Sequence, residues 1–596
     1  MYSRVRWRAL LLAALVTAFM APVAILAAPT PHGAVSGFHY VKLANGASVG
    51  LSKGQRPSMH MLDVSRLSRH AMTGGARFGS VPFRTRFTAA QFAAMKAAAV
   101  HNLSAPRLLN AISSVQPLWS TAPPAPEQLV TGLTDNFIVC AFFGTGCEPP
   151  DMAIAASPDW SVQATNTSVA VFDKHGVMVL GYPVDFPTFF GVPASCHGIP
   201  FTTDPRAFYD PNDQRFFVAM QAPNGVADTC TPSSTSYIAV SQTSNPSFGW
   251  NVYAINSAIA GPTYFADYTQ LGFDSQAVYI GGNQFNCCGP GYGGAFTIIL
   301  DKHAMEAGAA ISSPNVIGPY LAASSPTCPG GGCLLDTVNP TTSVANLSQQ
   351  PQATILVDAD QSNPTFPCGF GGITCNNIDV WGIAKPLAAS PIVSEQTIAL
   401  LNNFVLPPPG DEPGCPLCIE TIDNRVSGTP TFSPWDGGTV SFGLETAVNF
   451  GLITYPGYQW GQIAIKEAGN KLTSATLAQG GIVAASNSTH SFPATQLLPN
   501  GDMYLVSDIM SAAEYPGWEY RVRHAGDAAN TLSAPRLVQR GLDTYLLPFG
   551  VPGTGNLRWG DFEATSYAGF ATNGVWLAAQ YGNTDYDWGT SFAKVH

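Results

Sequence analysis

The fold is decided by an octapeptide phrase that occurs four times: DMAIAASP at 151–158, DPRAFYDP at 204–211, DYTQLGFD at 267–274 and DFEATSYA at 561–568. Each copy opens with an aspartate, runs through a short apolar or aromatic stretch and turns into a second such stretch. Short runs of this kind, bounded by turn residues, are typical of strands in an all-β protein. The recurrence of one phrase indicates a supersecondary unit that is repeated along the chain.

Less regular copies of the phrase begin near Arg425 and His490, and another group of strands lies around residues 340–383. Intervals of roughly 50 to 60 residues between phrases fit four-stranded blades with long loops. The predicted fold is therefore an all-β β-propeller of seven blades, with six as the alternative. Residues 588–595 are expected to supply a strand to the blade that closes the ring. A parallel β-helix is the second architecture considered, but its coils are shorter and more regular.

The composition supports many turns and a large apolar core. Of the 596 residues, 46% are hydrophobic and only 11% are charged, against roughly 25% charged residues in an ordinary soluble domain. The chain contains 58 glycines and 48 prolines. This composition argues against a helical bundle and excludes wholesale disorder.

The N-terminus predicts export. Arg4, Arg6 and Arg8 precede an apolar run at 9–28 that ends in small residues, which is the pattern of a cleaved signal peptide over residues 1–28. An uncleaved membrane anchor is the alternative, because the run approaches the length of a membrane span. No other stretch is long and apolar enough to cross a bilayer. The mature protein is expected to be secreted, either extracellular or periplasmic.

Twelve cysteines agree with an oxidising compartment. Most of them fall as close neighbours within glycine- and proline-rich stretches, which predicts small disulfide-closed loops. The expected pairs are Cys140–Cys147, Cys196–Cys230, Cys328–Cys333, Cys368–Cys375 and Cys415–Cys418, with the adjacent Cys287 and Cys288 as the sixth pair. A metal site at Cys415–Cys418 is not favoured, since no second cysteine pair or histidine pair matches it.

Charge divides the chain into two parts. Residues 29–126 carry ten Lys/Arg and one acid, Asp63, whereas residues 127–596 have a net charge of −23. We therefore predict a basic N-terminal extension at 29–126 and a propeller domain at 127–596. Within the extension, Thr88 is the expected N-cap of a helix over residues 89–101. Such asymmetry suggests an external anionic partner or docking of the extension on the acidic body.

Three stretches resemble the repeats of secreted bacterial β-propellers of the BNR/sialidase-like kind: PPDMAIAASPDWSVQATNTSVAVFDKHG (149–176), TTDPRAFYDPNDQRFFVAM (202–220) and NLRWGDFEATSY (556–567). SNPSFGW at 244–250 is similar to their degenerate Asp-box turn, although the aspartate is missing. The resemblance covers most of residues 148–596. It implies the propeller architecture and an extracellular, carbohydrate-related setting. The sequence contains no clean Asp box, and this argues against sialidase activity.

The repeated acids are the main candidates for a site. Equivalent strand starts should place them in an arc around one mouth of the central channel. Asp204, Asp561 and Glu563 are predicted as catalytic acids, because a pair of carboxyl groups performs glycoside hydrolysis. The predicted substrate-binding residues are Asp151, Asp267, Arg206, Arg425 and Arg558, since guanidinium groups bind carboxylates in bidentate fashion. His490 and Tyr567 are weaker candidates. The structural alternative is that each aspartate ties its strand to the neighbouring blade through backbone N–H groups.

These observations predict a secreted propeller that acts on or binds an extracellular glycan at the channel mouth, with glycoside hydrolysis as the reaction considered. The alternative is a non-catalytic propeller that binds a glycan or a surface protein. No cofactor is expected, apart from a structural calcium ion held by the acids as an option. The negative body argues against a nucleic-acid partner, and a monomer is expected. The basic extension is expected to be either a propeptide that is removed or a clamp that lies over the acidic mouth. The low surface charge suggests an acidic working environment.

Overall fold

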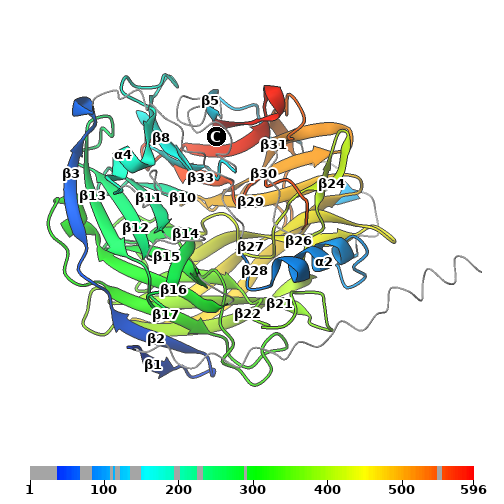
Figure 1. Ribbon diagram of the computed structural model, residues 1–596, viewed down its shortest axis with the longest axis horizontal. Coiled ribbons are helices and arrows are strands. Elements are labelled where there is room, and N and C mark those ends of the chain that lie inside the picture. Colours follow the sequence, from blue (N-terminus) through cyan, green and yellow to red (C-terminus); the bar gives the residue numbers. More distant parts are fainter. Residues whose placement is uncertain are drawn as a thin grey trace, which may run out of the picture. The chain divides into compact units, whose positions relative to one another are not determined.

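The computed structural model describes residues 37–67, 84–107, 112–113, 121–134, 149–193, 202–224, 233–287, 291–546 and 554–595. Residues 35–596 form one compact unit, in which seven antiparallel sheets are arranged around a central axis (Figure 1). The protein is a seven-bladed β-propeller. This confirms the predicted fold class, decides the blade number and excludes the β-helix.

Blades 1 to 3 follow one another along the chain. Their strands are β6 (Ala153–Ala156), β7 (Trp160–Thr165), β8 (Ser168–Asp173) and β9 (Val184–Asp185) in blade 1; β10 (Thr203–Asp210), β11 (Arg215–Asn224), β12 (Ser233–Ser241) and β13 (Gly249–Asn256) in blade 2; and β14 (Tyr264–Phe273), β15 (Ala277–Asn286), β16 (Tyr292–Asp301) and β17 (Asn315–Leu321) in blade 3.

Blades 4 to 6 repeat the arrangement. Their strands are β18 (Asn339–Pro340), β20 (Thr354–Ala359), β21 (Cys375–Ala384) and β22 (Ile392–Phe404) in blade 4; β25 (Thr431–Ser433), β26 (Thr439–Asn449), β27 (Thr454–Glu467) and β28 (Leu472–Ala485) in blade 5; and β29 (Thr489–Leu497), β30 (Met503–Ser511), β31 (Glu514–Arg523) and β32 (Arg536–Gln539) in blade 6. Strand β19 (Thr342–Ser343) joins blade 5 by parallel pairing with β25, and the hairpin β23 (Gly410–Glu412) and β24 (Cys415–Ile419) forms a sheet of its own.

Blade 7 closes the ring with both ends of the propeller sequence. It contains β33 (Ala564–Tyr567), β34 (Val575–Gly582), β35 (Trp588–Val595) and, as its fourth strand, β5 (Gln128–Thr134). Strand β5 pairs with β35, so that Phe592 lies opposite Val130. The predicted closing strand at 588–595 is thus present, and a strand from the beginning of the domain covers its outer edge.

The segment before the propeller adds strands to three blades. In Figure 1, β1 (His39–Lys42), β2 (Ser48–Lys53) and β3 (Ser58–Asp63) lie along the outer edges of blades 3 and 2. Strand β2 pairs with β17, and β3 pairs with β13. Strand β4 (Ile112–Ser113) pairs with β28 of blade 5. An outer edge strand with unpaired N–H and C=O groups favours such additions.

Helices are few and short. The longest is α2 (Ala89–Ala99), where Thr88 forms a capping box with Gln91, as the sequence predicts for the N-cap. The other described helices are α4 (Phe186–Phe190) and α5 (Lys302–Glu306), with 3₁₀ turns η1 (Val64–Arg66), η2 (Trp435–Gly437) and η3 (Thr584–Tyr586). Among the described residues, no helix is both long and apolar enough to span a membrane.

The core lies between neighbouring blades, so that each sheet is buried on both faces. Between blades 1 and 2, for example, Val162 and Val169 pack in one cluster with Phe216 and Trp250. Sheets covered on both faces need near-continuous apolar runs rather than strict alternation, which explains strands such as Ala277–Asn286.

Three of the predicted disulfides are confirmed: Cys328–Cys333, Cys368–Cys375 and Cys415–Cys418. Cys287 is also disulfide-bonded. The pairs Cys140–Cys147 and Cys196–Cys230, and the signal peptide predicted at 1–28, lie outside the described residues.

Candidate functional site

The repeated aspartates lie where the innermost strands begin. The first strands of neighbouring blades contact one another, and in a propeller they line the central channel. Asp204 has a φ of +54° at the start of β10, and Tyr268 (+59°) and Phe492 (+52°) hold the same left-handed conformation in β14 and β29. The strand register shifts at each of these points, as in a β-bulge. The bulge turns the first residues of the strand toward the neighbouring blade.

Side chains of one blade accept the backbone N–H of the next at these bulges. Asp204 Oδ2 accepts from Tyr268 N at 2.7 Å, and Asp151 Oδ1 accepts from Asp561 N at 2.7 Å. Three further hydrogen bonds are of the same kind, with a side-chain oxygen as the acceptor and a backbone N–H as the donor. They join Asn166 Oδ1 to Asp204 N, Asn283 Oδ1 to Thr337 N, and Glu445 Oε1 to Phe492 N. Because a buried N–H without a partner is costly, these contacts lock neighbouring blades together. For Asp151 and Asp204, this is the structural role considered in the sequence analysis, in which an aspartate connects neighbouring blades through backbone N–H groups.

The acids also converge in space. Asp151, Asp204 and Asp561 each offer a carboxylate oxygen within 4.8 Å of the others, and all three are buried. Burial raises the pKa of Asp151 well above its usual value, and the Asp561 charge raises it further, while Arg558 opposes the shift. Burial likewise raises the pKa of Asp204 and of Asp267. The cluster therefore favours bound protons or a nearby cation.

A calcium ion would find oxygen ligands here. Asp561 Oδ1 has no hydrogen-bond partner among the described residues. However, Arg558 binds the other oxygen, Asp561 Oδ2, at 2.6 Å and already supplies a positive charge. The donor set fits a cation, but this guanidinium makes binding of one less favourable.

The three predicted arginines are engaged within the protein. Arg425 binds Asp423 through both carboxylate oxygens at 2.7 Å, a partner that the sequence analysis did not identify. Arg206 donates to Thr269 O and Ser427 O, and its guanidinium lies 3.3 Å from the centre of the Phe562 ring.

A layer of side chains crosses the channel just past the acids. Arg206 reaches from blade 2 to Ser427 O, and the Tyr268 hydroxyl donates to Ser427 O and to Asp561 O. The Tyr268 ring packs edge-on against Phe562. These contacts connect residues of different blades next to Asp561.

The basic segment covers the acidic end. Lys96, on α2, donates to Thr421 Oγ1 and Ile422 O and forms a buried ion pair with Glu420 at 2.6 Å. Phe92 packs in one cluster with Ile422, Phe492 and Trp559. The positive charge of Arg84 lowers the pKa of Asp267 and so opposes the effect of burial. Arg86 lowers the pKa of Asp358 in the same way. Positive charge from residues 84–99 therefore lies against the acids, as the charge division of the sequence suggested.

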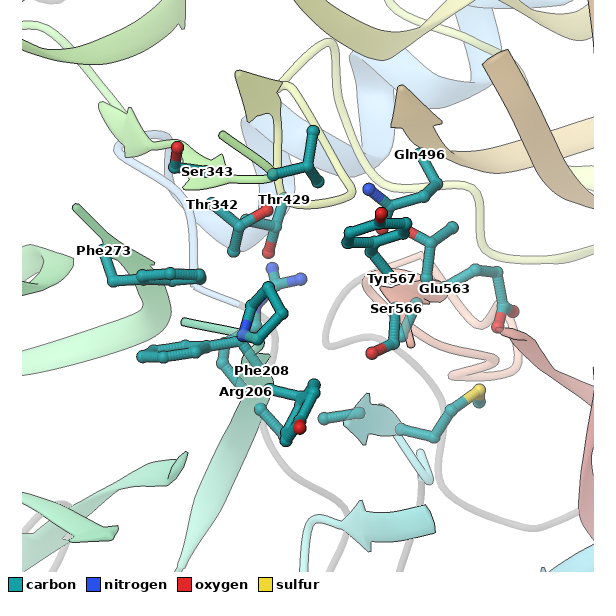
Figure 2. Close-up of a pocket in the computed structure, with 18 residues that line it drawn as sticks. Arg206, Phe208, Phe273, Thr342, Ser343, Thr429, Gln496, Glu563, Ser566 and Tyr567 are labelled. Atoms are coloured by element: carbon teal, nitrogen blue, oxygen red, sulfur yellow. The ribbon is translucent and has the colours of Figure 1, made fainter. Parts of the chain in front are cut away.

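A narrow cavity occupies the other part of the channel (Figure 2). Residues of six blades line it, and its walls contain the hydroxyls of Thr342 and Thr429, the Gln496 amide, Glu563 and the rings of Phe208, Phe273 and Tyr567. Its free volume is about 30 Å³, which is space for about one or two water molecules. This volume admits a hydroxyl group but not a whole sugar ring, so that a bound ring would have to lie at the open end of the cavity.

Glu563 lies near an acid that the sequence analysis missed. Asp508 and Glu563 are fully buried and lie close enough to affect each other's pKa, and Trp559 Nε1 donates to Asp508 Oδ2 at 2.6 Å. Burial raises the pKa of Asp508 to about 7 and the pKa of Glu563 well above its usual value. The two carboxyl groups influence each other's titration, and burial favours the protonated form of each. The available signal was an acid inside the apolar run MYLVSDIM at 503–510.

The two weaker candidates, His490 and Tyr567, lie in different surroundings. His490 Nδ1 lies 3.4 Å from Glu519 Oε1 in blade 6, whereas Tyr567 lines the cavity and donates to Asn573 Oδ1. A further acidic position is Asp358, whose two buried carboxylate oxygens find no hydrogen-bond partner in the described part of the chain. It lies directly opposite Asp379 in blade 4, and DADQSN at 358–363 was its sequence signal.

The chain matches no known family model, and no curated protein matches it. Solved structures of sialidase-like propellers are similar in fold. The Trypanosoma rangeli sialidase is 8% identical at a TM-score of 0.29, over 70% of this chain and 56% of that one. A Hadza microbial sialidase is 7% identical (TM-score 0.33), over 73% of each chain. A Dyadobacter fermentans protein of unknown function is 9% identical (TM-score 0.25), over 56% of this chain and 96% of that one. The chain thus spans little more than half of the first sialidase, and these similarities concern architecture alone.

Proposed function

We propose that this protein is an extracellular propeller that binds a glycan at the open end of its channel cavity without hydrolysing it through the aspartate arc. The observation that carries the proposal concerns two aspartates of the arc: Asp151 and Asp204 accept hydrogen bonds from backbone N–H groups of other blades. Residues occupied in this way are poorly suited to exchange protons with a substrate. The predicted signal peptide and the three disulfides support the extracellular setting.

The lining of the cavity favours a neutral glycan. Sugar hydroxyls donate hydrogen bonds, and both oxygens of the buried Glu563 lack a partner among the described residues. Thr342 and Thr429 add hydroxyl groups, and aromatic rings provide apolar faces for a sugar. The net charge of −23 over residues 127–596 disfavours polyanionic glycans.

Glycoside hydrolysis is the second candidate, favoured by Glu563 and Asp508. A carboxyl group with a pKa near 7 suits a general acid. However, the two carboxyl groups of a glycosidase flank the scissile bond of a bound substrate, whereas Asp508 and Glu563 are both fully buried. Neither group could reach a glycosidic bond without movement of the side chains around it, so that binding is the leading proposal.

Calorimetric titration of the secreted protein with neutral oligosaccharides tests the proposal. We expect binding that weakens by about tenfold in T342V and in T429V, since each loses one hydrogen bond while keeping its shape. T473V, which changes an exposed threonine of β28, should bind like the wild type. Absence of binding to every neutral glycan would contradict the proposal. Release of reducing sugar that is lost in E563Q would establish the second candidate instead.

A further inference from the structure

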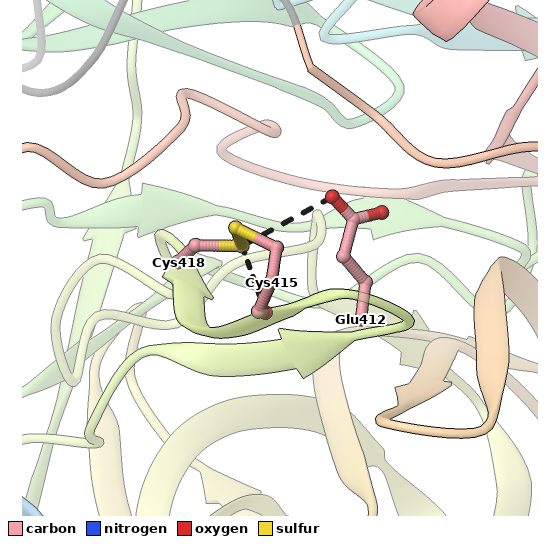
Figure 3. Close-up of side chains that lie close together, drawn as sticks. All are labelled: Glu412, Cys415 and Cys418. Atoms are coloured by element: carbon pink, nitrogen blue, oxygen red, sulfur yellow. Dashed lines mark hydrogen bonds between the residues drawn. A yellow bond between two sulfur atoms is a disulfide. The ribbon is translucent and has the colours of Figure 1, made fainter.

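The hairpin formed by β23 and β24 stands outside the seven blades and carries the Cys415–Cys418 disulfide (Figure 3). It lies next to the covered end of the channel: Leu557 N donates to Cys418 O at 2.6 Å, and Cys418 packs against the cluster that contains Phe92. Glu420, the partner of Lys96, follows β24 directly.

Cys415–Cys418 is the less buried of the three described disulfide pairs. Cys415 and Cys418 are both half-buried, and Leu417 between them is 42% exposed. Cys368 and Cys375 are both buried, and in the third pair Cys333 is half-buried but Cys328 is buried. Thiol–disulfide exchange requires an attacking thiolate to reach one of the sulfur atoms. Access therefore favours attack at Cys415–Cys418.

A buried carboxyl group lies beside the pair. Glu412 is 1% exposed; its Oε2 accepts from Tyr545 N at 2.8 Å, and its Oε1 lies 4.0 Å from Cys418 Sγ. A disulfide sulfur has no proton to donate, so this approach becomes a hydrogen bond only when Cys418 is a thiol. The pKa of Glu412 is raised to about 7, mainly by burial and to a smaller extent by the charge of Asp543. The hydrogen bond from Tyr545 N–H lowers this pKa but does not cancel the effect of burial. The carboxyl group can therefore give and take a proton near neutral pH.

We propose that Cys415–Cys418 is a thiol–disulfide exchange site for dithiol reductants, with Glu412 as the proton donor and acceptor of Cys418. A reductant thiolate attacks Cys415 Sγ, the Cys415–Cys418 bond breaks, and the Cys418 thiolate takes the Glu412 proton. The second reductant thiol then attacks the mixed disulfide, releases Cys415 as a thiolate that solvent protonates, and leaves as a disulfide. Two electrons pass from the dithiol to the protein. This activity is independent of glycan binding.

The test compares disulfides within the same folded protein. Full-length protein is incubated with dithiothreitol for increasing times, quenched and alkylated, and each pair is quantified by mass spectrometry. Cys415–Cys418 should be reduced at least about tenfold faster than Cys328–Cys333 and Cys368–Cys375, since reactivity follows access and local proton transfer. Equal rates for the three pairs would overturn the proposal, and this comparison needs no variant.

The role of Glu412 is tested by the pH profile. The wild-type rate, expressed per reductant thiolate, should fall as pH rises through about 7, because the ionised carboxylate cannot protonate Cys418. E412Q keeps an acceptor for Tyr545 N, but its rate per reductant thiolate should not change as pH passes through about 7. E306Q is the matched control, since burial raises the pKa of Glu306 in α5 to about 7 as well. A step that persists in E412Q, or disappears in E306Q, would contradict the assignment to Glu412.

Discussion

Asp151 and Asp204 show how one residue of the repeat acts across the ring. Each opens a copy of the phrase, has a positive φ and accepts a backbone N–H from another blade. The other copies differ: in the third, the positive φ belongs to Tyr268 rather than Asp267, and in the fourth, Asp561 is bound by Arg558. Residues that look equivalent in sequence thus perform different tasks, because each meets a different neighbour.

Asp204 provides the test of the tie. D204A removes the acceptor of Tyr268 N–H, and an unpaired buried donor should lower the free energy of unfolding by about 1–3 kcal/mol. D204N keeps an acceptor oxygen and removes a charge from beside Asp151 and Asp561, so that it should be as stable as the wild type. Urea denaturation of the two variants measures the difference. If D204N loses as much stability as D204A, the charge and not the hydrogen bond is what the fold requires.

At the scale of elements, α2 is built into the propeller. Its capping box begins it at Thr88, its Phe92 lies in the cluster that covers the inner strands, and Lys96 is 1% exposed. Strands β2 and β3 complete the edges of blades 3 and 2. These contacts support retention of residues 37–107 in the mature protein, which intact-mass measurement would check.

The contribution of α2 to stability can be measured through the Lys96–Glu420 ion pair. K96M leaves the Glu420 carboxylate buried opposite an apolar chain, which should cost about 3–5 kcal/mol of the free energy of unfolding. K174M changes an exposed lysine in blade 1 and should stay within about 0.5 kcal/mol. Denaturation of the two variants under one set of conditions compares them. A loss in K96M no larger than that in K174M would show that α2 does not hold the covered end of the channel together.

At the scale of the whole molecule, many acids are buried. Burial raises the pKa of Glu306, Glu395, Glu412 and Asp508 to about 7. Asp423 and Glu519 are exceptions, because the neighbouring Arg425 and Arg521 lower their pKa values despite burial. The fold therefore carries acids that prefer protons in the folded state, together with a smaller set that prefers ionisation.

The pH dependence of stability follows from the sign of these shifts. An acid with a raised folded pKa stabilises the fold fully below its unfolded pKa, and this contribution is lost as pH rises through the folded pKa. Between about pH 5 and about pH 8 the melting temperature should therefore fall by several degrees, since one pKa unit corresponds to about 1.4 kcal/mol. Below about pH 4, protonation of Asp423 and Glu519 should lower it again.

Thermal melts across this range measure the profile. A maximum between about pH 4.5 and about pH 6 is expected, in line with the acidic working environment suggested by the composition. A maximum at neutral pH would contradict both the burial argument and that suggestion. A profile measured in E412Q should keep the same sign, because the remaining raised acids are unchanged.

Features that depend on short-range pattern could be predicted from the sequence. The strand–turn period identified a propeller, Thr88 marked the start of a helix, and closely spaced cysteines identified three disulfides, because periodicity, capping and loop closure are local properties. It also brought out the acidic arc and the basic segment before the propeller.

The contacts between distant residues required the three-dimensional structure. Asp151 and Asp561 are 410 positions apart, Glu563 lies near Asp508 of another blade, and Lys96 forms an ion pair with Glu420. The physical reason is ring closure: the first strands of seven blades converge on one axis only when the last blade joins the first. That convergence determines whether an acid near the axis accepts a backbone N–H or binds an arginine. No local stretch of sequence contains this information.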